Sequence, residues 1–171
     1  SILLRNHGLH IEVKFNSEHF IGKIDSASIS DVLLESAITT IIDFEDSIAA
    51  VDVEDKVFCY NQWRGLMKGT LTAEFTKAGK LIQRELNKDK LFCSPNGETF
   101  QLPGRSLMLV RNVGHLMLSD AIIDYDNVMV PEGILDAMIT SVIGMIDLKG
   151  NRQLKNSRAG SIYIVKPKMH G

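Results

Sequence analysis

The fold of this chain is decided by the stretch Ile38-Thr39-Thr40-Ile41-Ile42-Asp43-Phe44-Glu45-Asp46. Its β-branched residues follow one another without alternating with polar ones, which is typical of a strand buried on both faces of a parallel sheet. The run then ends abruptly in Asp43, Glu45 and Asp46. Parallel α/β proteins bind their ligands at the carboxyl ends of the strands, so these acids mark a candidate site.

Two further strands of the same kind follow along the chain. Ser106–Val110 runs into Arg111, and Ser161–Val165 runs into Lys166. Helices are predicted between the strands. One covers Ser47–Lys68, with Ser47 or Asp46 as its cap and Gly69 as its stop. The other begins at Pro131, ends before Gly150, and repeats apolar residues at helical spacing (Ile134, Leu135, Met138, Val142, Ile143, Ile146). Strands that end in charge and alternate with helices predict a β/α layout.

The rest of the chain carries shorter elements. Leu9–Phe15 is predicted to be a strand, Asn16–Ser28 to be polar and turn-rich, and Ser30–Ala37 to be a short helix. Between the first two parallel strands, turn residues separate four short β segments, which predicts antiparallel hairpins (Leu71–Phe75, Lys80–Leu86, Leu91–Cys93, Thr99–Leu102). A complete (β/α)₈ barrel takes about 250 residues, so we expect this chain of 171 to be an internal piece of one.

Composition narrows the class of protein. Hydrophobic residues make up 44% and charged residues 23%, as in a globular chain with a substantial core. Lys and Arg number 19 against 21 Asp and Glu, so no basic excess favours nucleic acid or an anionic membrane. The apolar runs are too short to span a bilayer. Only two cysteines occur, Cys59 and Cys93, which favours a reducing cytoplasm over a disulfide framework.

The acids after the first strand could bind a hard cation. Asp43 and Glu45 lie two residues apart, so in an extended segment their side chains point the same way. Two such carboxylates can bind Mg²⁺ or hold the water molecules that Mg²⁺ tends to keep. An equally good interpretation is that one carboxylate caps the next helix and the other pairs with a lysine.

Arg111 is the strongest candidate for catalysis from the residues alone. It closes an apolar strand, and its guanidinium can direct two donors at a carboxylate or an enolate oxygen. The alternative is a structural ion pair with a carboxylate on a neighbouring strand end. Asp46 and Lys166 end strands too. The chain contains neither a Gly-rich phosphate loop nor a Gly-x-Ser-x-Gly elbow.

Four long runs of the chain closely resemble malate synthases of the G isoform type: Leu3–Glu12, Thr39–Asp52, Leu102–Met117 and Asn156–Gly171. The resemblance covers essentially the whole chain. Phe44 stands where the family usually has cysteine, and Ala159 where threonine is common; neither is a chemically active residue.

The resemblance implies a fold. It predicts a partial TIM (β/α)₈ barrel interrupted by an inserted, β-rich α/β domain. Residues 1–36 and 69–105 would belong to the insertion, and residues 37–68 and 106–171 would be barrel segments.

The resemblance also implies a reaction. Malate synthase condenses acetyl-CoA with glyoxylate in a Mg²⁺-dependent, Claisen-type step of the glyoxylate cycle and hydrolyses the product to malate and CoA. Arg111 matches the catalytic arginine that binds glyoxylate and stabilises the enolate. Ser47 and Arg84 match positions that contact acetyl-CoA, and Asp43 and Glu45 match acids that reach Mg²⁺ through water.

Other functional residues of that family lie outside this chain. They are the Glu and Asp that bind the metal directly and the aspartate that acts as general base. We therefore expect the 171 residues alone to be inactive, and the full-length protein to be a cytoplasmic monomer that binds neither nucleic acid nor membrane. Two alternatives remain: a CoA-thioester lyase of the citrate-lyase-β or malyl-CoA lyase type, and a non-catalytic truncated chain.

Overall fold

The computed structural model describes residues 1–35, 39–45, 52–150 and 154–167. The chain divides into two compact units. The first comprises Ser1–Ile38 and Lys90–Leu102, and the second comprises Thr39–Asp89 and Pro103–Gly171. Within the described ranges, neither helix combines the length and the apolar character needed to cross a membrane.

The first unit is built from antiparallel strands. It contains a three-stranded sheet of order β1-β2-β3 and, as a separate two-stranded sheet, the hairpin of β7 and β8. An ion pair of 2.6 Å between Lys90 Nζ and Glu12 Oε2 joins β7 to β2. The bounds are β1 Ile2–Asn6, β2 Leu9–Phe15, β3 Ile29–Leu34, β7 Lys90–Cys93 and β8 Thr99–Leu102. The strand predicted at Leu9–Phe15 and the hairpin are confirmed.

The short helix predicted from Ser30 is wrong, because Ile29–Leu34 forms strand β3. This strand pairs with β2, with Val32 opposite Val13 and Leu34 opposite Ile11. Six residues gain little from a helix of fewer than two turns, whereas the ladder to β2 satisfies their backbone groups and pairs β-branched side chains. Residues 36 and 37 of the predicted helix lie outside the described ranges.

The second unit contains the parallel sheet that the sequence predicted, with strand order β12-β9-β4. Its strands are β4 Thr39–Asp43, β9 Leu107–Arg111 and β12 Ile164–Val165. β4 and β9 are in parallel register from Thr39 opposite Leu107 to Asp43 opposite Arg111. The third strand is shorter than predicted: it spans Ile164 and Val165, which lie opposite Val110 and Arg111 of β9.

Two helices pack beside this sheet. Helix α1 spans Val53–Lys68, and the side chain of Asp52 caps it by accepting from the backbone N–H of Asp55 at 2.9 Å. Ser47 and Asp46 are therefore not its caps, and both lie outside the described ranges. The stop at Gly69 is confirmed, since Gly69 adopts a φ of 69° that favours glycine. Helix α2 spans Glu132–Lys149, with Pro131 as the residue before the helix rather than its first.

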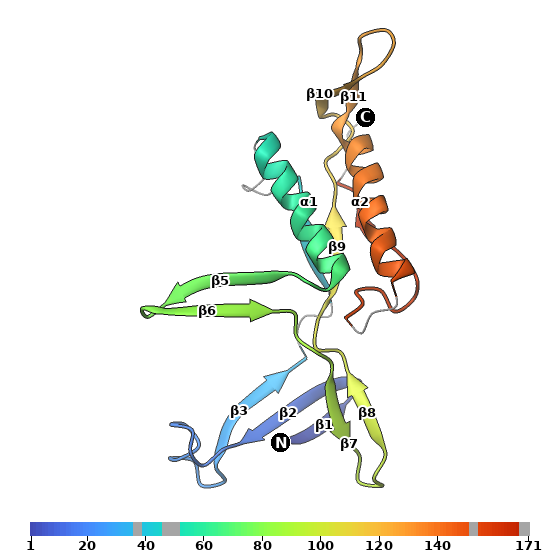
Figure 1. The fold of residues 1–171 in the computed structure, drawn as a ribbon. Coiled ribbons are helices and arrows are strands. Elements are labelled where there is room, and N and C mark those ends of the chain that lie inside the picture. The colour runs from blue at the N-terminus through green and yellow to red at the C-terminus, as the bar shows by residue number, and fades with distance from the viewer. Residues whose placement is uncertain (36–38, 46–51, 151–153, 168–171) are drawn as a thin grey trace. The chain divides into compact units, whose positions relative to one another are not determined.

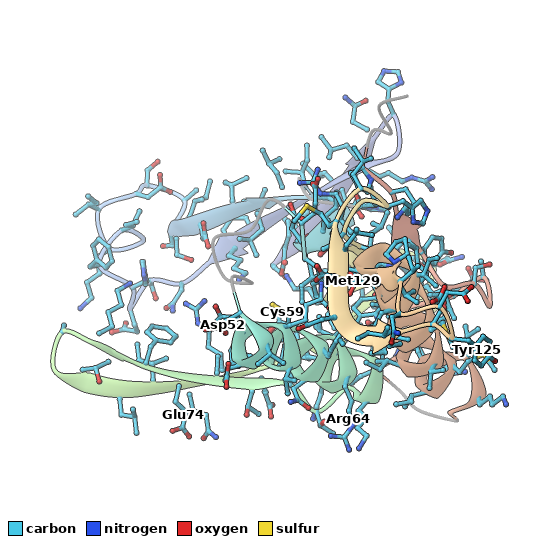
Figure 2. The ribbon with its side chains drawn as sticks, turned by 90° about the horizontal axis from the view of Figure 1, so that it is seen from above. Asp52, Cys59, Arg64, Glu74, Tyr125 and Met129 are labelled. Atoms are coloured by element: carbon cyan, nitrogen blue, oxygen red, sulfur yellow. The ribbon has the colours of Figure 1, made fainter. Side chains whose placement is uncertain are left out.

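The core lies between these helices and the sheet, and α1 and α2 lie side by side next to β9 (Figure 1). Trp63 is fully buried there, and its indole N–H donates to the carbonyl of Thr140 on α2 at 3.1 Å. Figure 2 shows Asp52 at the start of α1, with Cys59 and Arg64 further along. The buried residues that form the cluster are Phe44, Cys59, Trp63, Met67, Val110 and Ile143.

Two hairpins complete the second unit. The first consists of β5 Thr72–Lys77 and β6 Lys80–Glu85, close to the bounds expected from sequence. The second consists of β10 Leu118–Ile123 and β11 Met129–Pro131, joined by a turn. The Asp124 carboxylate closes that turn by accepting from the N–H groups of Asp126 and Val128.

Candidate active site

The parallel register of β4 and β9 brings the predicted acids and the predicted arginine together. Asp43 and Arg111 are opposite each other at the carboxyl ends of the two strands. Arg111 donates to Asp43 through two atoms, from Nε to Oδ1 at 2.9 Å and from Nη2 to Oδ2 at 2.7 Å. Arg111 Nη2 also lies 3.3 Å from Glu45 Oε2. The side chains are 24–30% exposed, so the cluster is half-buried.

The local backbone fixes the position of both acids. The N–H of Glu45 donates to Asp43 Oδ1 at 2.9 Å, and the N–H of Phe44 donates to the carbonyl of Arg111 at 2.9 Å. The strand pairing therefore continues one residue past Asp43. The two-point contact with Asp43 sets the plane of the Arg111 guanidinium, and this plane decides the direction from which an anion can approach.

Arg111 forms the ion pair with a carboxylate on the neighbouring strand end that the sequence left as the alternative to a catalytic role. The same geometry also places a guanidinium and two carboxylates at the strand ends, where barrel enzymes carry their chemistry. Both interpretations therefore begin from the same contacts. They differ in whether Arg111 also binds a substrate anion, which turnover measurements decide.

The oxygen donors of Asp43 and Glu45 suit Mg²⁺, which prefers carboxylates and retained water. Within the described part of the chain, however, no group of three or more His, Cys, Asp or Glu side chains could hold a metal ion. The pair therefore does not make a complete metal site by itself.

The other predicted site residues are not brought into this cluster by the described structure. Ser47 and Asp46 lie outside the described residues. Arg84 is exposed on β6, and its guanidinium carbon lies 5.0 Å from the centre of the Phe75 ring. Lys166 follows β12 and donates from Nζ to the carbonyl of Val113 at 3.0 Å, so it supports the loop after β9.

Sequence reasoning missed a buried carboxylate behind the strand ends. Asp136 on α2 is fully buried and accepts from Tyr60 OH at 2.5 Å, Lys56 Nζ at 3.0 Å and the N–H of Val113 at 2.8 Å. Lys56 Nζ also lies 2.7 Å from Glu132 Oε1. The one sequence signal was an acidic residue inside a largely apolar helix, and that signal names no partner.

Tyr60 gives a prediction for alkaline pH. Burial, and then the bond to the Asp136 carboxylate, raises the pKa of Tyr60 above its ordinary value of 10.0. Above that pH the unfolded chain releases the proton that the folded chain keeps, so the free energy of unfolding falls as pH rises. Each pH unit above 10 should cost up to about 1.4 kcal/mol from this group.

Urea denaturation at about pH 8 and about pH 11 tests this in the full-length protein. Tyr60→Phe should make the alkaline loss of stability smaller than in the wild type. Tyr125→Phe, at the tip of the β10–β11 hairpin (Figure 2), is the matched control and should keep the wild-type loss. Equal losses in all three proteins would contradict the prediction.

A separate surface hollow of about 530 Å³ lies toward the opposite ends of the strands. Its lining includes Arg105, which precedes β9, and Gly160, which precedes β12. Asp89 pairs there with Arg105 at 3.3 Å and with Arg158 at 2.9 Å. It contains none of the predicted site residues, so the strand-end cluster remains the candidate site.

Comparison with known proteins shows which family the chain is similar to. The family model described as "Malate synthase, TIM barrel domain" matches residues 107–171, which include Arg111 and β12. Malate synthase G of Halalkalibacterium halodurans is 59% identical over 170 residues, 99% of this chain. The Malate synthase G proteins of Corynebacterium glutamicum and Corynebacterium efficiens are 51% and 53% identical over the whole chain.

The chain spans 23% of the length of each of these relatives. Identity of more than half across essentially every residue, together with the family match over residues 107–171, shows the family. By sequence, this chain belongs to the malate synthase family, of the G type, and corresponds to about a quarter of its length.

Proposed function

We propose that the full-length protein is an acyltransferase that condenses acetyl-CoA with glyoxylate and hydrolyses the product to malate and CoA. One observation supports this most: Arg111, Asp43 and Glu45 meet at the carboxyl ends of adjacent parallel strands in a chain of the malate synthase family. The relatives' name supplies the reaction, and this cluster supplies residues suited to it.

Arg111 would bind the glyoxylate carboxylate and stabilise the enolate formed when the acetyl group loses its proton. A guanidinium held in a fixed plane by Asp43 stabilises negative charge that appears only along the reaction path, without having to reorient as it forms. Asp43 and Glu45 lower the cost of keeping this cation half-buried before substrate binds.

Asp43 and Glu45 would also hold the water molecules of a Mg²⁺ ion, whose direct ligands would come from segments beyond these 171 residues. When bound, the metal would act as a Lewis acid on the glyoxylate aldehyde. The general base would likewise come from outside this chain. Within it, the two acids orient Arg111 and present oxygen atoms to the metal's hydration shell.

We further propose that Ser47 and Arg84 contact acetyl-CoA. Exposed Arg84 carries a fork of donors suited to a phosphate, and its guanidinium lies over the Phe75 ring. Residues 1–36 and 69–105 would form the domain inserted into the barrel. In support, Ser1–Ile38 and Lys90–Leu102 form a unit of their own, although residues 69–89 group with the barrel strands.

The setting would be the glyoxylate cycle of the cytoplasm, with the protein acting as a monomer and binding neither nucleic acid nor membrane. The sequence has two cysteines, too few for a disulfide framework, which supports a reducing compartment.

Product identification tests the proposed function. The full-length protein with acetyl-CoA, Mg²⁺ and ¹³C-labelled glyoxylate should yield labelled malate and free CoA in equal amounts, followed by NMR. Omitting glyoxylate is the control for simple thioester hydrolysis. If labelled malyl-CoA accumulates without being hydrolysed to malate, or is only cleaved back to acetyl-CoA and glyoxylate, the protein is a lyase instead.

The 171 residues alone should produce no malate. The chain lacks the proposed direct metal ligands and the general base, and it exposes large apolar side chains such as Ile41, Met138 and Val142 at 49–69%. The same NMR assay checks this, with the full-length protein at equal concentration as the positive control. Mg²⁺-dependent malate from the isolated chain would contradict it.

A further inference from the structure

The buried carboxylate of Asp136 is not used by the mechanism above, yet it contacts the chain that leaves the catalytic strand. Val113 lies two residues after Arg111, and its N–H donates to Asp136 Oδ2 at 2.8 Å. Its carbonyl accepts from Lys166 at 3.0 Å. Gly133 lies so close that an added Cβ would sit 2.4 Å from that carbonyl. The peptide groups of Val113 are thus held from several sides.

The donors to Asp136 from α1 also hold the neighbouring strand end. Lys56 Nζ lies 5.4 Å from the centre of the Phe44 ring, and the Tyr60 ring meets Phe44 edge-on at 5.4 Å. Phe44 separates Asp43 from Glu45 and is 1% exposed. Because side chains alternate along an extended segment, the two acids face Arg111 while Phe44 faces this buried cluster.

Stability alone does not account for such a cluster. Apolar side chains of equal volume would join α1 to α2 about as well as a buried ion pair does. They could not accept the N–H of Val113, which would then be left buried without a partner. A carboxylate at this position therefore serves the loop after β9 in particular.

We propose that Asp136 is a positioning residue, which holds the ends of β9 and β4 so that Arg111 stays aligned with Asp43 and the substrate. This proposal rests on the proposed function. Substitution of Asp136 should therefore act through Arg111, lowering turnover more than substrate affinity, and should loosen the Val113 amide whether or not the enzyme is active.

The kinetic test uses Asp136→Asn in the full-length protein, which keeps the shape and removes the charge. We expect kcat to fall about 100-fold with the KM for acetyl-CoA within about threefold, as for a small misplacement of a reacting group. Asp147→Asn is the matched control. Asp147 lies at the other end of the same helix and is 3% exposed. Its carboxylate accepts from the backbone N–H groups of Asn156 and Ser157. Its kcat should stay within about threefold of wild type.

A double-mutant cycle shows whether the effect passes through Arg111. In an Arg111→Lys background, Asp136→Asn should lower kcat by less than about tenfold, because the group that it positions is already altered. If Asp136→Asn lowers kcat by the same factor in the wild-type and Arg111→Lys backgrounds, the proposal is overturned. It is also overturned if Asp147→Asn lowers kcat as much as Asp136→Asn does.

Hydrogen exchange of the Val113 amide, followed by mass spectrometry, separates this proposal from the proposed function. Asp136→Asn should speed exchange in the peptide spanning residues 107–117 by about tenfold or more, and Asp147→Asn should not. If the wild type makes no malate but the amide responds, the proposed function fails and the positioning of the loop stands. Unchanged exchange in Asp136→Asn overturns the positioning role itself.

Discussion

Arg111→Ala in the full-length protein is expected to lower glyoxylate-dependent CoA release by about 1,000-fold or more. The substitution removes the cation proposed to bind glyoxylate and to stabilise the enolate. It also leaves Asp43 and Glu45 together without the guanidinium that pairs with both of them. Initial rates with a thiol reagent provide the measurement, with circular dichroism to confirm that the fold is kept.

Two other variants show what the arginine supplies. Arg111→Lys keeps the charge but loses the two-point contact with Asp43, so we expect an intermediate loss of about 100-fold. Arg158→Ala removes another arginine that pairs with an aspartate, toward the opposite ends of the strands, and should stay within about twofold of wild type. If Arg111→Ala keeps more than a tenth of wild-type turnover, the ion pair is only structural.

Trp63→Ala is expected to cause the largest loss of stability, about 3–5 kcal/mol. Trp63, on α1, is 0% exposed and packs against α2 and the sheet. Its indole N–H donates to the carbonyl of Thr140. Its removal leaves a cavity and a buried carbonyl without its donor. Urea denaturation of the full-length protein, followed by far-ultraviolet circular dichroism, measures the loss in the transition that includes this domain.

The neighbouring exposed residue provides the control for Trp63. Arg64→Ala on the same helix (Figure 2) should change the free energy of unfolding by less than about 0.5 kcal/mol. Trp63→Phe, which keeps part of the volume but loses the N–H, should fall between the two. A loss below about 1 kcal/mol in Trp63→Ala would show that this core contributes little to stability.

The sequence predicted the parallel strands because their signal is local. Thr39–Asp43 and Leu107–Arg111 are apolar runs that end in charge, and the rule for ligand sites in parallel sheets then pointed to Asp43, Glu45 and Arg111. The family resemblance implied chemical roles for these residues. It did not predict the two hydrogen bonds from Arg111 to Asp43, since that contact depends on the register of the strands.

The failures came from interactions between distant parts of the chain. Strand β3 forms through its pairing with β2, which overrides the weak local preference of Ile29–Leu34 for a helix. On α2, the apolar residues at helical spacing do not all face the core: Ile143 is buried, whereas Ile134, Met138 and Val142 are exposed. The buried side also carries small and polar residues, including Asp136, whose partners Lys56 and Tyr60 are far away in sequence.

The central claim is that this chain supplies the arginine site of a malate synthase. The most direct measurement is the rate of CoA release by the full-length protein with acetyl-CoA and Mg²⁺, with and without glyoxylate. The account predicts release that requires glyoxylate and collapses in Arg111→Ala while the fold is kept. A folded wild-type protein that releases no CoA when glyoxylate is added would contradict it.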